Sequence, residues 1–334
     1  MKTLRKVFAI ILTLTTLFSV VAMTGCSDDR EAVIIYTSAE DYRIEYLNSR
    51  LKEEFPQYNI KIEYMSTGNL AAKIKAEGKD TECDIIYDMD YGYMMQLEKE
   101  NVFANLKGKY DTSKYTDDAI ISDYFLPEIR NGGAVIVNVE MLEEKGIAVP
   151  TCYADLLKPE YKDLISMPNP KTSGTGYMFL KSLVNAMGEE AAFDYFKKLS
   201  ANVVEFTSSG SGPVENLKIK ETAIGLGMTA DAVKANNDGG NFQILYFEEG
   251  SPYSLYGQTI IAGREEKAAV KEVFDFMINT YSDENLQKFY PEQIYKDKTF
   301  EIENYPKNIN YADMSNNSYQ EKERLLKKWS ESVN

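Results

Sequence analysis

Three short turns in this chain combine serine or threonine with glycine, at 66–69 (STGN), 171–177 (KTSGTGY) and 208–212 (SSGSG). Each follows a predicted strand and precedes a predicted helix. The start of a helix exposes unpaired backbone N–H groups and carries partial positive charge. Hydroxyls and glycines there let a small anion approach the backbone. One such turn is more often an ordinary helix cap, but three together predict a small-anion site.

Two pairs of side chains could add further chemistry. Asp88 and Asp90 directly follow a buried apolar run. They could do acid–base work, cap the next helix or meet a ligand ammonium. Tyr253 and Tyr256 could bind a trivalent cation, stack on an organic ligand or pack at a domain interface. The residue types alone leave these alternatives open.

The chain contains no histidine. This excludes the Ser-His-Asp and Cys-His mechanisms and every histidine-containing metal site. Besides Cys26 there are only Cys83 and Cys152, which cannot form a disulfide framework, and their pairing cannot be read from the sequence. We therefore expect a site built from oxygen and backbone nitrogen, no enzyme activity and no catalytic cofactor.

The elements that position these groups alternate along the chain. Strands are expected at 32–36, 59–64 and 84–87, with helices at 42–55, 70–76 and 91–100. This alternation predicts an α/β fold with a parallel sheet, in which ligand groups gather at the carboxyl ends of the strands. A Gly-led strand at 132–138 indicates a crossing into a second lobe, and 258–262 indicates the return. The expected division is 32–131 plus about 258–334 for lobe 1, and 132–257 for lobe 2.

The first 26 residues resemble an export signal. Lys2, Arg5 and Lys6 precede an apolar run at 7–22, and small residues lead to Cys26. This is the layout of a secretory signal, and the run is too short and polar for a membrane span, which needs about 20 apolar residues. The four residues 23–26 resemble the lipobox of bacterial lipoproteins. We expect a signal peptide at 1–25, lipid on Cys26 and a polar tether at 26–31.

The charge balance is acidic. The net charge is −15, and it becomes −18 for 26–334 because the signal carries three basic residues and no acidic ones. Such a balance argues against nucleic acid and against adhesion to anionic lipid. It is typical of a solvated, exported surface.

Several stretches together resemble a known family. They are YTSAEDY (36–42), STGNLAAKIKAEG (66–78), DIIYDMD (84–90), VPTCYADLLKPEYKDLISMPNP (149–170), SGTGY (173–177) and EGSPYSLYGQTIIAG (249–263). In order and spacing they are similar to the solute-binding lipoproteins of bacterial ABC importers, in the ferric-iron-binding branch of the periplasmic binding proteins. The resemblance covers about residues 31–285.

The resemblance implies a two-lobed periplasmic binding protein (type II) fold, with a hinge and a ligand cleft between the lobes. The protein would be a monomer that serves an ABC permease and its ATPase, held to the outer face of a bacterial membrane by lipid. By position, the residues implied to face the cleft are Ser38, Thr67, Asp88, Ser173, Thr175, Ser211, Asp231 and Tyr253.

The cargo has two candidates. Family membership favours ferric iron, held by Tyr253 and Tyr256 with a bound anion. However, the adjacent tyrosines that iron-binding members carry after the strand at 223–228 are replaced here by Gly-Met-Thr-Ala-Asp at 227–231. The hydroxyl-rich turns favour a phosphorylated or carboxylated ligand. Two alternatives from other classes are an exported enzyme and a lipid-anchored surface antigen.

Overall fold

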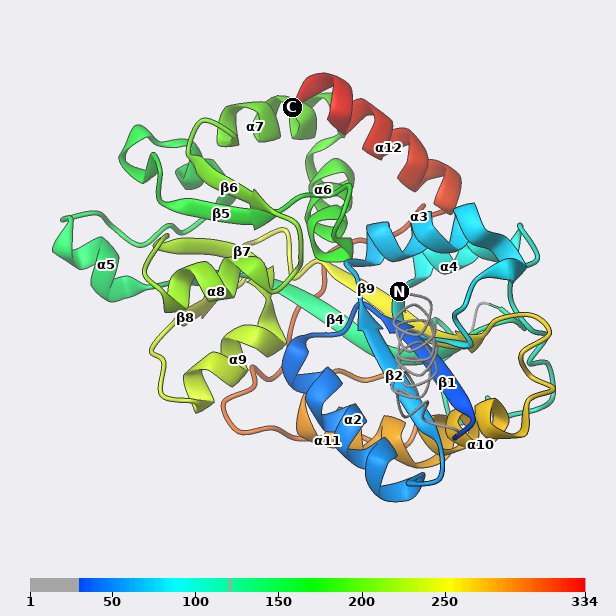
Figure 1. Cartoon of the computed structure of the whole chain (residues 1–334). Helices are drawn as coiled ribbons and strands as arrows, with labels where there is room; N and C mark the ends of the chain where they lie inside the picture. The colour runs from blue at the N-terminus through cyan, green and yellow to red at the C-terminus, as the bar shows by residue number, and fades with distance from the viewer. Residues whose placement is uncertain (1–29, 120–121, 334) are drawn as a thin grey trace, which may run out of the picture.

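The computed structural model describes residues 30–119 and 122–333. The predicted signal peptide and Cys26 lie outside this range. The strands within these residues form one continuous, mixed sheet, which Figure 1 shows running through both halves of the molecule. Its strands lie in the order β2 (Asn59–Tyr64), β1 (Ala32–Thr37), β3 (Ile85–Asp90), β9 (Tyr253–Ile260), β4 (Leu126–Val137), β7 (Ile224–Met228), β5 (Ile165–Pro168) and β6 (Val203–Thr207), and β8 (Gln243–Leu245) pairs with β4.

The expected parallel strands are present in both halves. β1 pairs in parallel with β2 and with β3, and β5 pairs in parallel with β6 and with β7. We call the half that contains β1, β2, β3 and β9 the first lobe. The half that contains β5, β6, β7 and β8 is the second lobe. The two-lobed α/β fold predicted from the sequence is thus confirmed.

β4 joins the two lobes. Its residues up to Gly132 pair with β9, whereas Gly133 and the residues after it pair with β7. This strand is longer than the strand predicted at 132–138, because its first half includes the buried polar residues Glu128, Arg130 and Asn131. Polar side chains inside a buried strand obscure the apolar pattern that identifies it.

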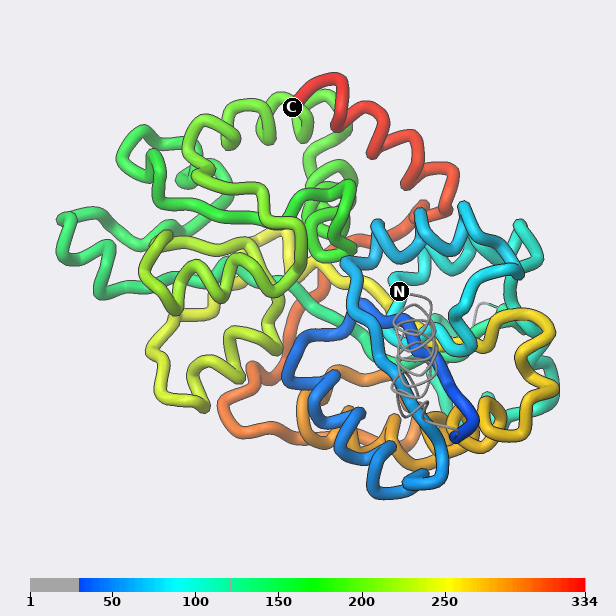
Figure 2. Tube along the Cα trace, in the orientation of Figure 1, coloured from blue at the N-terminus to red at the C-terminus, as the bar shows by residue number. Residues whose placement is uncertain are grey.

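Helices cover both faces of each lobe (Figures 1 and 2). In the first lobe they are α2 (Asp41–Glu54), α3 (Thr67–Glu77), α4 (Tyr91–Glu98), α10 (Ala268–Phe276) and α11 (Ser282–Lys288). In the second lobe they are α5 (Val139–Glu144), α6 (Gly174–Met187), α7 (Glu189–Leu199), α8 (Gly212–Lys218) and α9 (Thr229–Asn237). None of the described helices combines the length and the apolar character that crossing a bilayer requires.

The last helix, α12 (Tyr319–Ser332), contacts both lobes (Figure 1). Its Trp329 is fully buried in the core of the second lobe, against the rings of Phe196 and Phe206. Its Lys322 forms a buried ion pair with Asp90 of the first lobe. The C-terminal segment therefore supplies a helix that links the two lobes.

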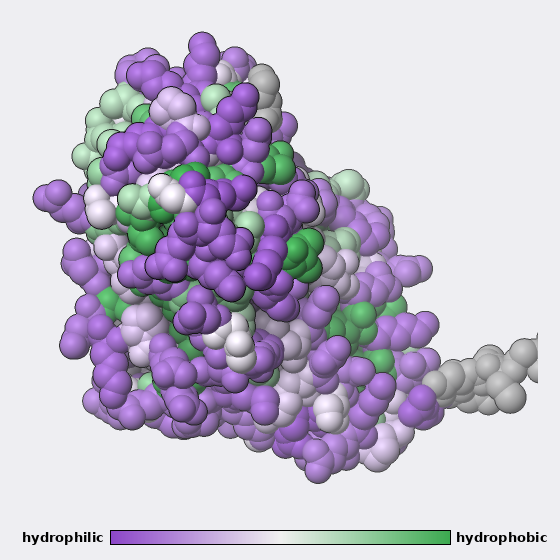
Figure 3. Space-filling view, turned by 90° about the vertical axis from the view of Figure 1, so that its left-hand side faces the viewer, coloured by the Kyte–Doolittle hydropathy of each residue, from purple (hydrophilic) through white to green (hydrophobic). Residues whose placement is uncertain are grey.

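The surface fits an exported protein. Figure 3 views the molecule from its second-lobe side and shows mainly hydrophilic residues, with the hydrophobic ones in small separate patches. Among the described residues, the large hydrophobic side chains that are exposed are Tyr64, Val204 and Ile219. Cys83 is buried, Cys152 is partly exposed, and both are free thiols.

The lobes touch where α3 and α6 begin. The Gly68 N–H donates to the carbonyl oxygen of Thr172 at 3.0 Å. A β-carbon on Gly68 would lie 2.5 Å from the carbonyl oxygen of Lys171, closer than atoms pack. The absence of a side chain at Gly68 thus permits this closed arrangement.

We expect Gly68→Ala to open the lobes, because the added methyl group meets backbone that cannot move aside without separating α3 from α6. Small-angle X-ray scattering should show a larger radius of gyration than that of the wild type, with an unchanged circular dichroism spectrum. Ala72→Ser, at an exposed position of the same helix, is the control. Equal radii of gyration for all three proteins would contradict this expectation.

Candidate functional site

A cavity of about 270 Å³ lies between the lobes. The first lobe contributes the segments that follow the carboxyl ends of β1 and β2, together with Asp88 of β3. The second lobe contributes the first turn of α6, the loop before α8 and the start of α9. The lining residues are Ser38, Ala39, Glu40, Asp41, Tyr42, Tyr64, Ser66, Thr67, Asp88, Ser173, Gly174, Thr175, Ser209, Gly210, Ser211, Glu215, Met228, Asp231 and Tyr256.

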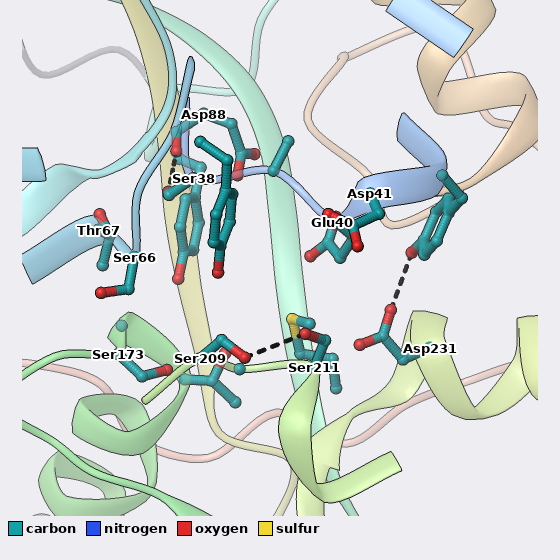
Figure 4. Close-up of a pocket in the computed structure, with 18 of the residues that line it drawn as sticks. Ser38, Glu40, Asp41, Ser66, Thr67, Asp88, Ser173, Ser209, Ser211 and Asp231 are labelled. Atoms are coloured by element: carbon teal, nitrogen blue, oxygen red, sulfur yellow. Dashed lines mark hydrogen bonds between the residues drawn. The ribbon is translucent and has the colours of Figure 1, made fainter. Parts of the chain in front are cut away.

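One side of the cavity is rich in hydroxyls. Figure 4 places Ser66, Thr67, Ser173 and Ser209 together on this side, which we call the hydroxyl end. Thr67 Oγ1 accepts a hydrogen bond from the Asp90 N–H at 3.1 Å, and Ser173 Oγ accepts one from the Gly176 N–H at 3.3 Å. Because a backbone group already donates to each oxygen, the hydroxyl protons of Thr67 and Ser173 remain able to donate to a ligand.

Two further features make the hydroxyl end suited to an anion. Ser66 is buried, and its Oγ has no hydrogen-bond partner within the described part of the chain. The N-termini of α3 and α6, one from each lobe, both begin at this end. Helix N-termini present N–H groups and partial positive charge to an anion, and buried hydroxyls without partners are costly unless a ligand satisfies them.

The opposite side of the cavity is acidic. Glu40, Asp41 and Asp231 lie there in Figure 4, and Glu215 of α8 also lines the cavity. We call these four residues the acid end. No lysine or arginine is among the described lining residues. The two ends therefore differ in chemistry: one offers hydrogen-bond donors and the other offers carboxyl oxygens.

Arg43 lies behind the cavity and is fully buried. Its guanidinium donates to Glu40 at 3.0 Å, to Asp88 at 2.9 Å and to Glu128 at 2.7 Å. It also donates to Tyr87 Oη at 2.9 Å and to Asn285 Oδ1 at 3.1 Å. One positive charge thus faces three buried carboxyls, so the cluster cannot be neutral with all three ionised.

Burial raises the pKa of three acidic side chains at the site. Burial raises the pKa of Asp88 to about 8, although Arg43 opposes that rise. Burial also raises the pKa of Glu40, and it raises the pKa of Asp231 well above its usual value. The pKa of Tyr256 is likewise raised, first by burial and then by Asp90, Asp88 and Glu40. Its phenol form is therefore favoured over the phenolate.

Most of the residues expected at the cleft line this cavity. They are Ser38, Thr67, Asp88, Ser173, Thr175, Ser211 and Asp231, together with the tentative metal ligand Tyr256. The hydroxyl of Ser38 is already engaged, because it donates to the Asp88 carbonyl oxygen.

Tyr253 does not line the cavity with the others. Its ring lies 4.7 Å from the Arg130 guanidinium and packs edge-on against Tyr311. The reason is the alternation of side chains along a strand: Ser254 and Tyr256 share one face of β9, and Tyr253 points to the other. Asp88 and Asp90 also separate, since Asp88 pairs with Arg43 and Asp90 with Lys322.

The sequence reasoning missed most of the acid end. Glu40 and Asp41 stand beside Ser38 in the stretch 36–42, so their position after β1 could have identified them. Tyr42 and Glu215 carry no such signal, because each sits in a helix whose cavity-facing side cannot be known before the lobes are assembled. Ser66 and Ser209 belong to the predicted hydroxyl-rich turns.

We expect Arg43→Met to lower the free energy of unfolding by about 3–5 kcal/mol at neutral pH, because it leaves buried carboxyls unpaired. The loss should be larger at pH 8 than at pH 5, since those carboxyls ionise as the pH rises. Urea denaturation at pH 5 and at pH 8 measures the loss in the free energy of unfolding. Lys52→Met is the control, because Lys52 is exposed on the same helix.

The wild-type protein should also lose stability as the pH rises toward 8. A carboxyl whose pKa is raised on folding contributes stability below its unfolded pKa, about 4 for aspartate, and loses it as the pH passes the folded value. Asp88, with its pKa of about 8, follows this rule. An Arg43→Met protein as stable as the wild type at pH 8 would contradict the proposed charge balance.

Comparisons with known proteins place this site in a family. The model of the family "Bacterial extracellular solute-binding protein" matches residues 80–317. An uncharacterized protein of Haemophilus influenzae is 25% identical over 326 residues, which is 93% of each chain. The periplasmic binding protein AfuA from Actinobacillus pleuropneumoniae, with fructose-6-phosphate bound, has a TM-score of 0.78 at 23% identity, over 91% of this chain and 99% of that one.

Iron-bound HitA from Pseudomonas aeruginosa has a TM-score of 0.72 at 15% identity, over 89% of this chain and 99% of that one. The solved structures therefore share the two-lobed fold and include proteins with different bound ligands. They share the fold that the resemblance implied. This chain belongs to the bacterial extracellular solute-binding proteins.

Proposed function

We propose that this protein captures a small phosphorylated organic compound, such as a sugar phosphate, outside the cytoplasm and delivers it to the permease of an ABC importer. The observation that carries the proposal is the hydroxyl end, where Ser66, Thr67 and Ser173 meet the N-termini of α3 and α6 from both lobes. A phosphoryl group bound there would receive donors from both lobes and so favour the closed state.

The rest of the cavity suits the body of such a compound. Carboxyl oxygens accept hydrogen bonds from hydroxyl or amino groups, and the acid end has several of them. A volume of about 270 Å³ lies just below the usual range of ligand sites, about 300–1,000 Å³, and so suits a small compound. AfuA, whose fold is similar, was solved with a sugar phosphate bound. Nothing in this arrangement calls for turnover of the ligand.

Ferric iron is the second candidate cargo. Tyr256 lines the cavity beside Asp88, and HitA with bound iron has a similar fold. Two features weigh against iron. Tyr253 lies away from the cavity, and burial, followed by Asp90, Asp88 and Glu40, raises the pKa of Tyr256 in the metal-free protein. We therefore place the phosphorylated compound first.

We also propose how the lobes divide and move. The change of partner between Gly132 and Gly133 supports a hinge at the predicted boundary of 131/132. The second boundary, at 257/258, falls inside β9, whose pairing is with β3 and β4. Because α12 packs into the second-lobe core, the C-terminal part of the first lobe would end before Tyr319.

The main test is isothermal titration calorimetry of residues 27–334 with hexose phosphates, glycerol phosphate, inorganic phosphate and ferric citrate. We expect a phosphate ester to bind, and Ser66→Ala to weaken it about tenfold or more, since hydrogen bonds to charged groups contribute about 1.5–3 kcal/mol. Ser66 Oγ has no partner to lose, so the variant should keep the stability of the free protein.

Ser200→Ala, at the end of α7 and away from the cavity, is the matched control. Tight binding of ferric citrate without any phosphate ester, together with loss of iron in Tyr256→Phe, would overturn the assignment in favour of iron. Unchanged ester affinity in Ser66→Ala would remove the hydroxyl end from the binding site.

Cys26 is proposed as the lipid-bearing residue that holds the protein near its transporter. We expect labelled fatty acid to attach to the wild-type chain in bacterial cells and not to a Cys26→Ser variant, which should be released from the membrane fraction. A variant that stays bound to the membrane would show that the N-terminal segment anchors the protein without lipid.

A further inference from the structure

Asp231 at the acid end is incompletely satisfied. The carboxyl is 6% exposed, and its Oδ1 accepts a hydrogen bond from Tyr42 Oη at 2.9 Å across the two lobes. Its Oδ2 is buried and has no hydrogen-bond partner within the described residues. Figure 4 shows one oxygen of Asp231 directed toward that bond and the other turned back toward the cavity. A buried carboxyl oxygen without a partner is costly, which points to a donor that the ligand supplies.

The groups around Asp231 do not provide that donor. Glu40 and Glu215 are acidic, and both add to the negative potential at Asp231. Arg43 opposes that potential, but its N–H groups already donate to Glu40, Asp88 and Glu128 in the buried cluster. Lys234 of α9 bonds to Asp238 and lies over the ring of Tyr42. The acid end therefore has an excess of carboxyls, of which Glu40 and Asp231 are buried and Asp41 and Glu215 are exposed.

On the basis of the proposed function, we infer that the ligand is zwitterionic, with a phosphoryl group at the hydroxyl end and a protonated amine bound by Asp231 at the acid end. A hydroxyl in the same place would give one hydrogen bond. An ammonium group favours the ionised form of Asp231, gives it charge-assisted bonds, which are about twice as strong, and offsets the excess of carboxyls. The substrate class is thus small phosphorylated amines, including amino sugar phosphates.

The test uses matched pairs of ligands that differ only in an amine and a hydroxyl. They are glucosamine 6-phosphate against glucose 6-phosphate, and 2-aminoethyl phosphate against 2-hydroxyethyl phosphate. Calorimetry at pH 7 on residues 27–334 should give at least tenfold tighter binding for the amine of at least one pair. Asp231→Asn, which keeps an oxygen for Tyr42, should abolish this preference by weakening the binding of the amine much more than that of its hydroxyl partner.

Asp238→Asn on the same helix is the control, because Asp238 is exposed and pairs with Lys234, and it should keep the preference. If Asp231→Asn does not fold by circular dichroism, Glu40→Gln takes its place and should reduce the preference. Equal binding within both pairs, or tighter binding of the hydroxyl compound in both, would overturn the inference and leave the proposed function standing. If neither pair binds and none of the phosphate esters of the main test binds, both are overturned.

Discussion

The buried guanidinium of Arg43 is the interaction on which the rest of the site depends. It joins α2 to β3 through Asp88, to β4 through Glu128 and to α11 through Asn285, all behind the cavity. Removing ions from water is costly, and one cation cannot offset three carboxyls. The cluster therefore fixes the floor of the cleft and leaves an excess of carboxyl groups beside it.

This excess explains why the cavity has two chemically different ends. The carboxyl ends of β1 and β3 bring Glu40 and Asp88 to Arg43, and Asp231 arrives from the second lobe. At the other end, the N-termini of α3 and α6 oppose each other, and the described lining residues include no lysine or arginine. Such an arrangement favours an elongated ligand with an anionic group at one end and proton donors at the other.

Closure of the lobes depends on contacts that only one arrangement permits. The Gly68–Thr172 hydrogen bond, the Tyr42–Asp231 hydrogen bond and the Tyr93–Lys171 hydrogen bond all cross between the lobes. Lys322 adds to these from α12, where it lies over the rings of Tyr93 and Tyr177 and pairs with Asp90. A ligand that satisfies both ends of the cavity would add to these contacts and shift the population toward the closed state.

The local pattern of the sequence predicts much of this site. Ser, Thr and Gly after apolar β-branched runs correctly place Thr67, Ser173 and Ser211 at the cavity, because the carboxyl ends of parallel strands meet in space. It is harder to predict which side chains of a strand point toward the cavity when the two ends of the strand are uncertain. β9 begins at Tyr253, several residues before the predicted start, and Tyr253 and Tyr256 consequently point in opposite directions.

Long-range assembly could not be predicted in the same way. Arg43 reads as an ordinary polar position of an amphipathic helix, and only the tertiary structure surrounds it with Glu40, Asp88 and Glu128. α12 reads as a polar tail, because the burial of Trp329 depends on a partner from the second lobe. Pairings between residues that are distant in the chain leave no periodic signal in a single sequence.

The most direct measurement of the central claim, that the cleft has an anion-binding end and an acid end, is a crystal structure of residues 27–334 with glucosamine 6-phosphate bound. Our account predicts the phosphoryl group beside Ser66, Thr67 and Ser173, and the amine within hydrogen-bonding distance of Asp231. A ligand bound in the reverse orientation, or a phosphoryl group held outside the hydroxyl end, would contradict it.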